Sequence, residues 1–178
     1  LQAPRQKART DAQGRPVLLA DQDRGRWDRL LIRRGLAALQ RAEALSAARG
    51  PYTLQAAIAA CHARAARADA TDWPRIAALY GELARVQPSP VVELNRAVAV
   101  GMAFGAAQGL AIVERLLEEG SLRQYHWLPS VQADLLARLG RRDEARAAWL
   151  QAAGLAGNAS EKRLLIERAQ ALDASPRR

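Results

Sequence analysis

Apolar residues recur at steps of three and four along most of this chain, which is the period of an α-helix with one buried face. Near the start, the steps predict a helix that runs from a cap at Asp21 or Asp23 to about Ala48. Its inward face is predicted to consist of Trp27, Leu31, Gly35, Ala38, Ala42 and Leu45, widened by Ile32, Leu36 and Leu39. Residues 1–22 lack such a pattern, so we expect an extended lead-in, a helical domain over 23–173 and a frayed tail over 174–178.

Helix start and stop signals divide the rest of the chain into short helices. Proline near a helix start and glycine after a helix end predict that the first helices of successive hairpins span about 52–66, 90–103 and 127–139. The uncharged run from Ala97 to Val113 contains three glycines and is too short to span a membrane. We interpret this run as two buried helix faces joined by a turn near Phe104 and Gly105.

Composition supports an all-α fold. The chain has 178 residues with 40 alanines but only eight Phe, Trp and Tyr side chains together, which favours helices over strands. Seven to eight helices are expected. A single cysteine, Cys61, excludes a disulfide within the chain.

A weak repeat lies in the second helix of each expected hairpin. The same spacing, a step of four residues followed by a step of three, occurs in three triplets. These are Ile76, Tyr80 and Leu83, then Gly109, Val113 and Leu116, and then Ala145, Trp149 and Ala152. The offsets between them are 33 (109 − 76) and 36 (145 − 109), close to the tetratricopeptide (TPR) period. The pattern predicts antiparallel helix hairpins stacked as a TPR-like right-handed superhelix, with Trp149 buried between hairpins.

A more specific resemblance covers about 150 residues. The motifs occur in the order LLADQDRGRWD at 18–28, GPYTLQAAIAACHA at 50–63, TDW at 71–73, PSPVVELNRAVAV at 88–100, YHWLP at 125–129 and ADLLARLGR at 133–141. Together they resemble the C-terminal TPR-like extension of bacterial extracytoplasmic-function (ECF) sigma factors. No segment resembles the sigma helices that bind polymerase or promoter DNA, and the chain begins at Leu1. We therefore expect it to be part of a longer protein.

The resemblance implies a cytoplasmic, bacterial protein-interaction domain that modulates transcription initiation. Its implied partners are its own sigma regions, the RNA polymerase core or a signalling protein, with promoter DNA bound only by the missing N-terminal regions. A generic TPR-like adaptor unconnected with transcription is one alternative. An accessory nucleic-acid-binding module is another, because the net charge is +9 and residues 1–50 carry eleven basic against five acidic side chains.

No residue set in the sequence predicts catalysis, a metal site or a cofactor. Cys61 and His62 are adjacent on a helix and point about 100° apart, so they cannot act as a dyad. We expect Cys61 in the core and His62 at the rim of the binding surface. The other histidine, His126, lies between Tyr125 and Trp127, and two histidines with one cysteine match no metal-binding spacing.

Two groups of residues are candidates for binding. A TPR-like array presents the first helix of each hairpin on its concave face, so the candidate partner-binding residues are Asn95, Arg96, Gln132, Arg138 and His62. Four residues near the first helix are candidate interdomain docking or capping groups, namely Asp23, Arg24, Trp27 and Asp28.

Overall fold

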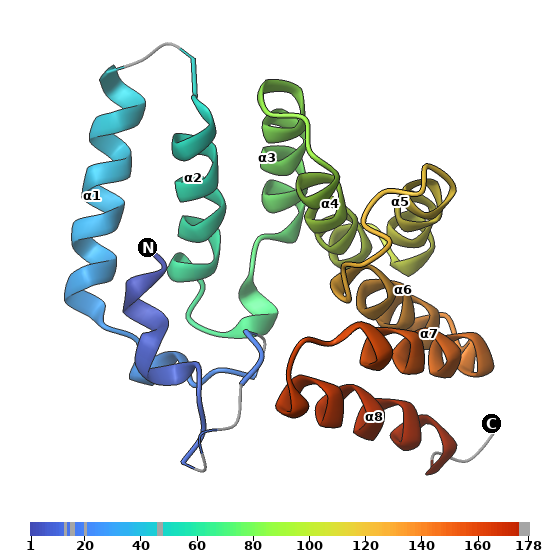
Figure 1. Ribbon diagram of the computed structural model, residues 1–178. Coiled ribbons are helices and arrows are strands. Elements are labelled where there is room, and N and C mark those ends of the chain that lie inside the picture. Colours follow the sequence, from blue (N-terminus) through green and yellow to red (C-terminus); the bar gives the residue numbers. More distant parts are fainter. Residues whose placement is uncertain (13, 15–16, 20, 46–47, 175–178) are drawn as a thin grey trace. The chain divides into compact units, whose positions relative to one another are not determined.

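The computed structural model describes residues 1–12, 14, 17–19, 21–45 and 48–174. This part of the chain contains eight α-helices, three short 3-10 helices and no strand (Figure 1). Helices adjacent in sequence pack in pairs, so the predicted all-α fold of stacked hairpins is confirmed. Contacts divide the chain into two compact units, unit 1 over Leu1–Gln87 and unit 2 over Pro88–Arg178.

Unit 1 is built around a hairpin with one long helix beside it. Its elements are η1 (Ala3–Ala8), η2 (Arg24–Arg26), α1 (Arg29–Leu45), α2 (Pro51–Arg64), η3 (Ala68–Ala70) and α3 (Trp73–Val86). Helices α2 and α3 pack against each other, α1 packs on α2, and η1 contacts α1. The hairpin buries Leu54 and Ile58 from α2 and Ile76, Leu79 and Leu83 from α3.

The start of unit 1 differs from the prediction of an extended lead-in followed by a helix from Asp21 or Asp23. Ala3–Ala8 form a 3-10 helix in which Ala8 is buried. The long helix begins only at Arg29, because the backbone at Trp27 is extended and the Asp28 carboxylate accepts a hydrogen bond from the backbone N–H of Leu31 at 2.9 Å. This bond gives Asp28 the role of the helix N-cap. The helix is described to Leu45, and positions 46–47 lie outside the described residues.

The inward face predicted for this helix is correct only in part, because Trp27, Ile32 and Leu39 are buried but Leu31, Ala38, Ala42 and Leu45 are exposed. In α1 the buried side chains are Ile32 and Leu39, whereas Leu31 is 39% exposed and Leu45 is 88% exposed. The two sets lie about 100° apart around the helix. Both sets of apolar residues have helical periodicity, and packing of α1 against η1 and α2 buries only the set that contains Ile32 and Leu39.

Unit 2 contains two successive hairpins and a last helix. Its elements are α4 (Pro90–Ala103), α5 (Ala106–Glu118), α6 (Trp127–Arg138), α7 (Arg142–Leu155) and α8 (Ala159–Ala174). Helices α4 and α5 form one hairpin and α6 and α7 the next, α5 packs on α6, and α8 packs on α7. The predicted turn near Phe104 and Gly105 is confirmed, with Gly105 at φ +116°. The first helices of the hairpins lie close to the predicted ranges.

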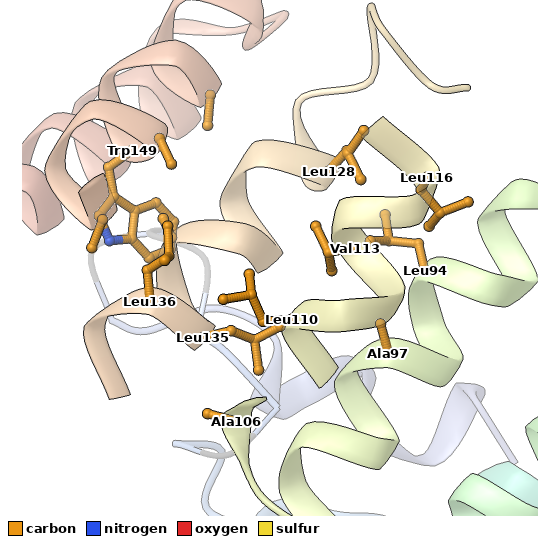
Figure 2. Packing of buried hydrophobic residues seen from close by; sticks show 14 of the residues in the cluster. Leu94, Ala97, Ala106, Leu110, Val113, Leu116, Leu128, Leu135, Leu136 and Trp149 are labelled. Atoms are coloured by element: carbon orange, nitrogen blue, oxygen red, sulfur yellow. The ribbon is translucent and has the colours of Figure 1, made fainter. Parts of the chain in front are cut away.

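A single hydrophobic cluster joins the helices of unit 2 (Figure 2). Every residue of the two repeat triplets in α5 and α7 is buried, including Trp149 at 5% exposure. Ala97, Val113, Ala133, Ala145 and Ala152 have no measurable exposure, so small side chains occupy the points where helices meet. The repeat seen in the sequence therefore marks the inner face of the second helix in each hairpin.

Helices α4 and α5 approach so closely that glycine is required at their crossing. A Cβ atom added to Gly109 would lie 2.7 Å from the carbonyl oxygen of Ala97 and 2.8 Å from the Cα atom of Gly101. Both atoms belong to the backbone of α4, so no side-chain rotation can relieve the overlap. The spacing of this hairpin is thus set by backbone contact.

We predict that Gly109→Ala lowers the free energy of unfolding by about 1–3 kcal/mol, the usual cost of overpacking. The matched control is Gly154→Ala in α7, where an added Cβ would have no heavy atom within 4 Å. That change is expected to stabilise by about 0.5–1 kcal/mol because alanine favours helix more than glycine does. Urea denaturation of both variants measures the difference, and equal stabilities would contradict the close backbone contact.

Candidate protein-interaction site

Two exposed stripes of side chains run along α4 and α6, the first helices of the two hairpins of unit 2. The stripe on α4 consists of Val91, Asn95, Val98 and Met102. The stripe on α6 consists of Trp127, Val131, Asp134 and Arg138. In each helix the four residues are separated by steps of four, three and four, which align them on one side. Val98 and Val131 are half-buried and the other six are exposed.

The two stripes are equivalent positions of the repeat. Val91 and Trp127 differ by 36 residues, as do Met102 and Arg138. At one end the stripes meet directly, because Nη2 of Arg138 donates to the carbonyl oxygen of Gly101 at 3.0 Å and Nη1 contacts Sδ of Met102 at 3.3 Å. We call this surface the α4/α6 face.

The chemistry of the α4/α6 face suits a protein segment. Val91, Met102 and Trp127 expose apolar area, while Asp134 and Arg138 provide one charge of each sign. Asn95 donates from Nδ2 to the carbonyl oxygen of Val91 at 3.0 Å, which leaves its side-chain oxygen for an external donor. Apolar anchors mixed with a few polar groups are typical of protein interfaces.

The candidate residues Arg96 and Gln132 lie on a different side of the same helices, about 100° from Asn95 and Val131. Arg96 makes two hydrogen bonds to Glu93, at 2.9 Å and 2.5 Å, and these bonds lower the pKa of the Glu93 carboxyl. Arg115 of α5 lies 3.9 Å from the same carboxylate. The charge of Arg96 is therefore balanced within unit 2, and Gln132, its equivalent in the repeat, is half-buried.

Sequence reasoning missed Met102 and Trp127. Both belong to residue types that usually indicate core, yet Met102 is 42% exposed and Trp127 is 45% exposed. Aligning the first helices with the 36-residue offset would have placed them beside Asn95 and Arg138.

The four candidate docking residues are engaged within unit 1. Asp23 accepts from the backbone N–H of Gly25 at 2.8 Å, and Asp28 caps α1. Trp27 is 3% exposed and packs with Ala8, Ile32 and Ala63, while Arg24 is 6% exposed. Arg24 and Trp27 hold the start of the chain to the hairpin and expose little surface for another domain.

Arg24 is the polar centre of unit 1. Its Nη1 donates to the carbonyl oxygens of His62 at 2.7 Å and Ala65 at 2.8 Å, and Nη2 donates to Oγ1 of Thr71 at 3.1 Å. Its guanidinium carbon lies 4.9 Å from the centre of the Trp27 ring, within the range of a cation–π interaction. One side chain therefore satisfies carbonyls at the end of α2, binds the loop before α3 and covers Trp27.

His62 lies beside this centre and is half-buried. Its ring packs edge-on against Trp73 with ring centres 5.3 Å apart. Burial, with the charges of Arg5 and Arg24, lowers the pKa of His62 from 6.5 to about 4. His62 is consequently neutral at physiological pH, and its buried Nδ1 has no hydrogen-bond partner among the residues that the structure describes.

Cys61 and His126 are the other two reactive side chains that the sequence analysis considered. Burial, assisted by Asp72, raises the pKa of the Cys61 thiol, which disfavours the thiolate needed for nucleophilic attack. His126 Nε2 lies 3.8 Å from Glu161, which joins the start of α6 to α8. In the described part of the chain, no three His, Cys, Asp or Glu side chains are grouped to hold a metal ion. No described helix combines the length and apolarity needed to cross a membrane.

Comparisons with known proteins match this chain to relatives without an assigned role. A family of unknown function (DUF6596) matches residues 1–43, which cover η1, η2 and most of α1. An uncharacterized protein of Rhizobium meliloti (strain 1021) is 48% identical over 176 residues, which are 99% of this chain and 41% of that protein. The chain thus spans less than half the length of this relative. No solved structure shows significant similarity.

We predict that Arg24→Ala lowers the free energy of unfolding by about 2–4 kcal/mol, because it leaves buried acceptors unpaired and a void beside Trp27. Arg26→Ala is the matched control, since Arg26 belongs to the same 3-10 helix and is exposed. Its effect is expected within about 0.5 kcal/mol. Denaturation followed by tryptophan fluorescence tests both variants, and a loss below about 1 kcal/mol for Arg24→Ala would disprove its central role.

The lowered pKa of His62 predicts a loss of stability in mild acid. The folded protein binds this proton less tightly than the unfolded chain, so the contribution of His62 is complete above pH 6.5 and declines as the pH falls toward 4. Between pH 7 and pH 5, the expected loss is on the order of 1–2 kcal/mol. Unfolding of His62→Gln over the same range should show a correspondingly smaller loss, and identical pH profiles would contradict the prediction.

Proposed function

We propose that this chain is the C-terminal TPR-like interaction domain of an ECF-type sigma factor and that its α4/α6 face regulates transcription initiation. In this proposal the face binds sigma regions of the same protein, the polymerase core or a signalling protein. The proposed binding activity rests on one observation, the two exposed and equivalent stripes on α4 and α6, which Arg138 connects. The transcriptional role is supported by the ordered motifs from Leu18 to Arg141.

Two further facts support the proposal. The match of residues 1–43 to DUF6596 is compatible with the sigma-factor resemblance. The Rhizobium relative extends well beyond the matched region, which is the arrangement expected for a domain attached to other functional regions. Regions tethered in one polypeptide meet at effective concentrations of about millimolar, so even a weak contact with the α4/α6 face would be occupied.

The test is reporter transcription driven by the full-length protein, with and without residues 88–178, at matched abundance. We expect deletion to change promoter output strongly. Asn95→Glu should change it in the same direction, because the Asn95 side chain is exposed and donates its hydrogen bond to Val91 of its own helix. Arg163→Glu, on the exposed side of α8, serves as the control for a surface charge change and should leave output unaltered.

Different outcomes favour the alternatives. Unchanged output after deletion would contradict the regulatory role and favour a generic adaptor. Binding of the isolated chain to duplex DNA that weakens steeply with salt would favour an accessory nucleic-acid-binding module. Thermal unfolding of each variant confirms that any change in output does not come from loss of the fold.

A further inference from the structure

Helix α1 carries an apolar stripe that the described residues of unit 1 leave exposed. Only Ile32 and Leu39 of this 17-residue helix are buried. Leu31, Ala38, Ala42 and Leu45 are exposed on another side of the helix, and Leu45 is 88% exposed. Figure 1 shows α1 at the edge of unit 1, with α2 along one side of it. We call these four residues the α1 stripe.

The spacing of the α1 stripe fits another helix. Leu31, Ala38 and Leu45 recur every seven residues, the repeat by which two helices keep contact along their length. Alanine occupies the middle of the stripe, so a partner backbone can approach closely there, with leucines at both ends. On one border, the Leu1 side chain packs against Gly35 and continues the apolar surface. An extended segment would not match the seven-residue repeat.

The other border of the stripe is positively charged. Arg34 and Arg41 are also seven residues apart and lie on the same side of the α1 stripe, about 60–80° from Leu31. Both are exposed, and among the described residues neither forms an ion pair with a carboxylate. Along its whole length, α1 carries Arg29, Arg33, Arg34 and Arg41 against Glu43.

This charge disfavours a second copy of the chain as the occupant. Two antiparallel α1 helices joined through their stripes would place Arg34 of one copy near Arg41 of the other. Like charges at such positions are destabilising. Carboxylates spaced seven residues apart on a different helix would instead meet both arginines, so charge complementarity selects an acidic partner.

We propose that the α1 stripe binds an amphipathic helix of a partner protein, with leucine or alanine facing the stripe and Asp or Glu facing Arg34 and Arg41. This surface belongs to unit 1, and the inference is independent of the role proposed for the α4/α6 face in unit 2. The DUF6596 match includes all of the stripe except Leu45. Leucine contacts supply affinity, and the two arginines select the partner by charge.

The experiment uses the full 178-residue chain and two synthetic 21-residue helical peptides. Both peptides carry the same leucine and alanine heptads, and they differ only in having Glu or Lys at the flanking positions. Isothermal titration calorimetry measures binding. We expect the Glu peptide to bind about ten-fold more tightly than the Lys peptide, since two attractive pairs replace two repulsive ones.

Charge reversal provides the decisive comparison. Arg34→Glu with Arg41→Glu should invert the preference, so that the Lys peptide binds more tightly. The matched control is Arg29→Glu with Arg33→Glu, the same change of charge on the opposite side of α1, and it should retain the preference for the Glu peptide. Leu31→Gln with Leu45→Gln should abolish binding of both peptides while the circular dichroism melting curve stays unchanged, because both leucines are exposed.

Several results would overturn the inference. The first is that the Glu peptide does not bind, and the second is that the two charge-reversed variants change the peptide preference equally. The third is that analytical ultracentrifugation shows a dimer of the chain that Leu31→Gln dissociates. Displacement of the Glu peptide by duplex DNA through Arg34 and Arg41 would assign the surface to nucleic acid. Asn95→Glu should leave peptide binding unchanged. Peptide binding therefore tests the α1 stripe alone, whereas reporter transcription tests the regulatory role of the α4/α6 face.

Discussion

Close approach of paired helices is the constraint on which unit 2 depends. Residues without bulky side chains lie where its helices cross, and at Gly109 the backbone of α5 nearly touches the backbone of α4. Such proximity increases dispersion contacts and leaves little space for rearrangement. It also fixes the orientation of α4 and α6, and through them the positions of Asn95 and Arg138. The α4/α6 face therefore rests on closely packed helices.

Unit 1 is held together in a different way. The described part of residues 1–28 forms only two 3-10 helices, and a buried arginine makes the connections that side-chain packing makes in unit 2. Arg24 satisfies two carbonyls at the end of α2 and reaches Thr71. Part of the arginine excess near the start of the chain thus has a structural role, and net charge alone overstates the cationic surface available to nucleic acid.

The elements that could be predicted from the sequence are those determined by local signals. Proline and glycine positions gave the helix boundaries of unit 2, and the 36-residue repeat identified Val113 and Trp149 as core. The buried side of α1 was only partly predictable in this way, because the predicted face combined the buried Ile32 and Leu39 with the exposed Leu31, and only packing against η1 and α2 distinguishes them. The contacts of Arg24 span 38 to 47 residues, so no local pattern reveals them.

The candidate site was predicted in part. Asn95 and Arg138 do lie on neighbouring stripes, because helical spacing and the repeat place them there. Arg96 lies on another side of α4, because adjacent residues of a helix point about 100° apart, and its guanidinium is paired with Glu93. The 36-residue offset places Met102 and Trp127 on the same stripes, but a sequence does not show that their apolar side chains are exposed.

The division of the chain at Gln87 and Pro88 has a consequence for spectroscopy. Each unit has its own buried cluster and two of the four tryptophans, Trp27 and Trp73 in unit 1 and Trp127 and Trp149 in unit 2. In each pair one indole is buried and the other is more accessible to solvent. Total fluorescence therefore averages two structural regions and four environments. Proteins that keep a single tryptophan, one in each unit, would show whether the two halves lose their structure in one cooperative step or in succession.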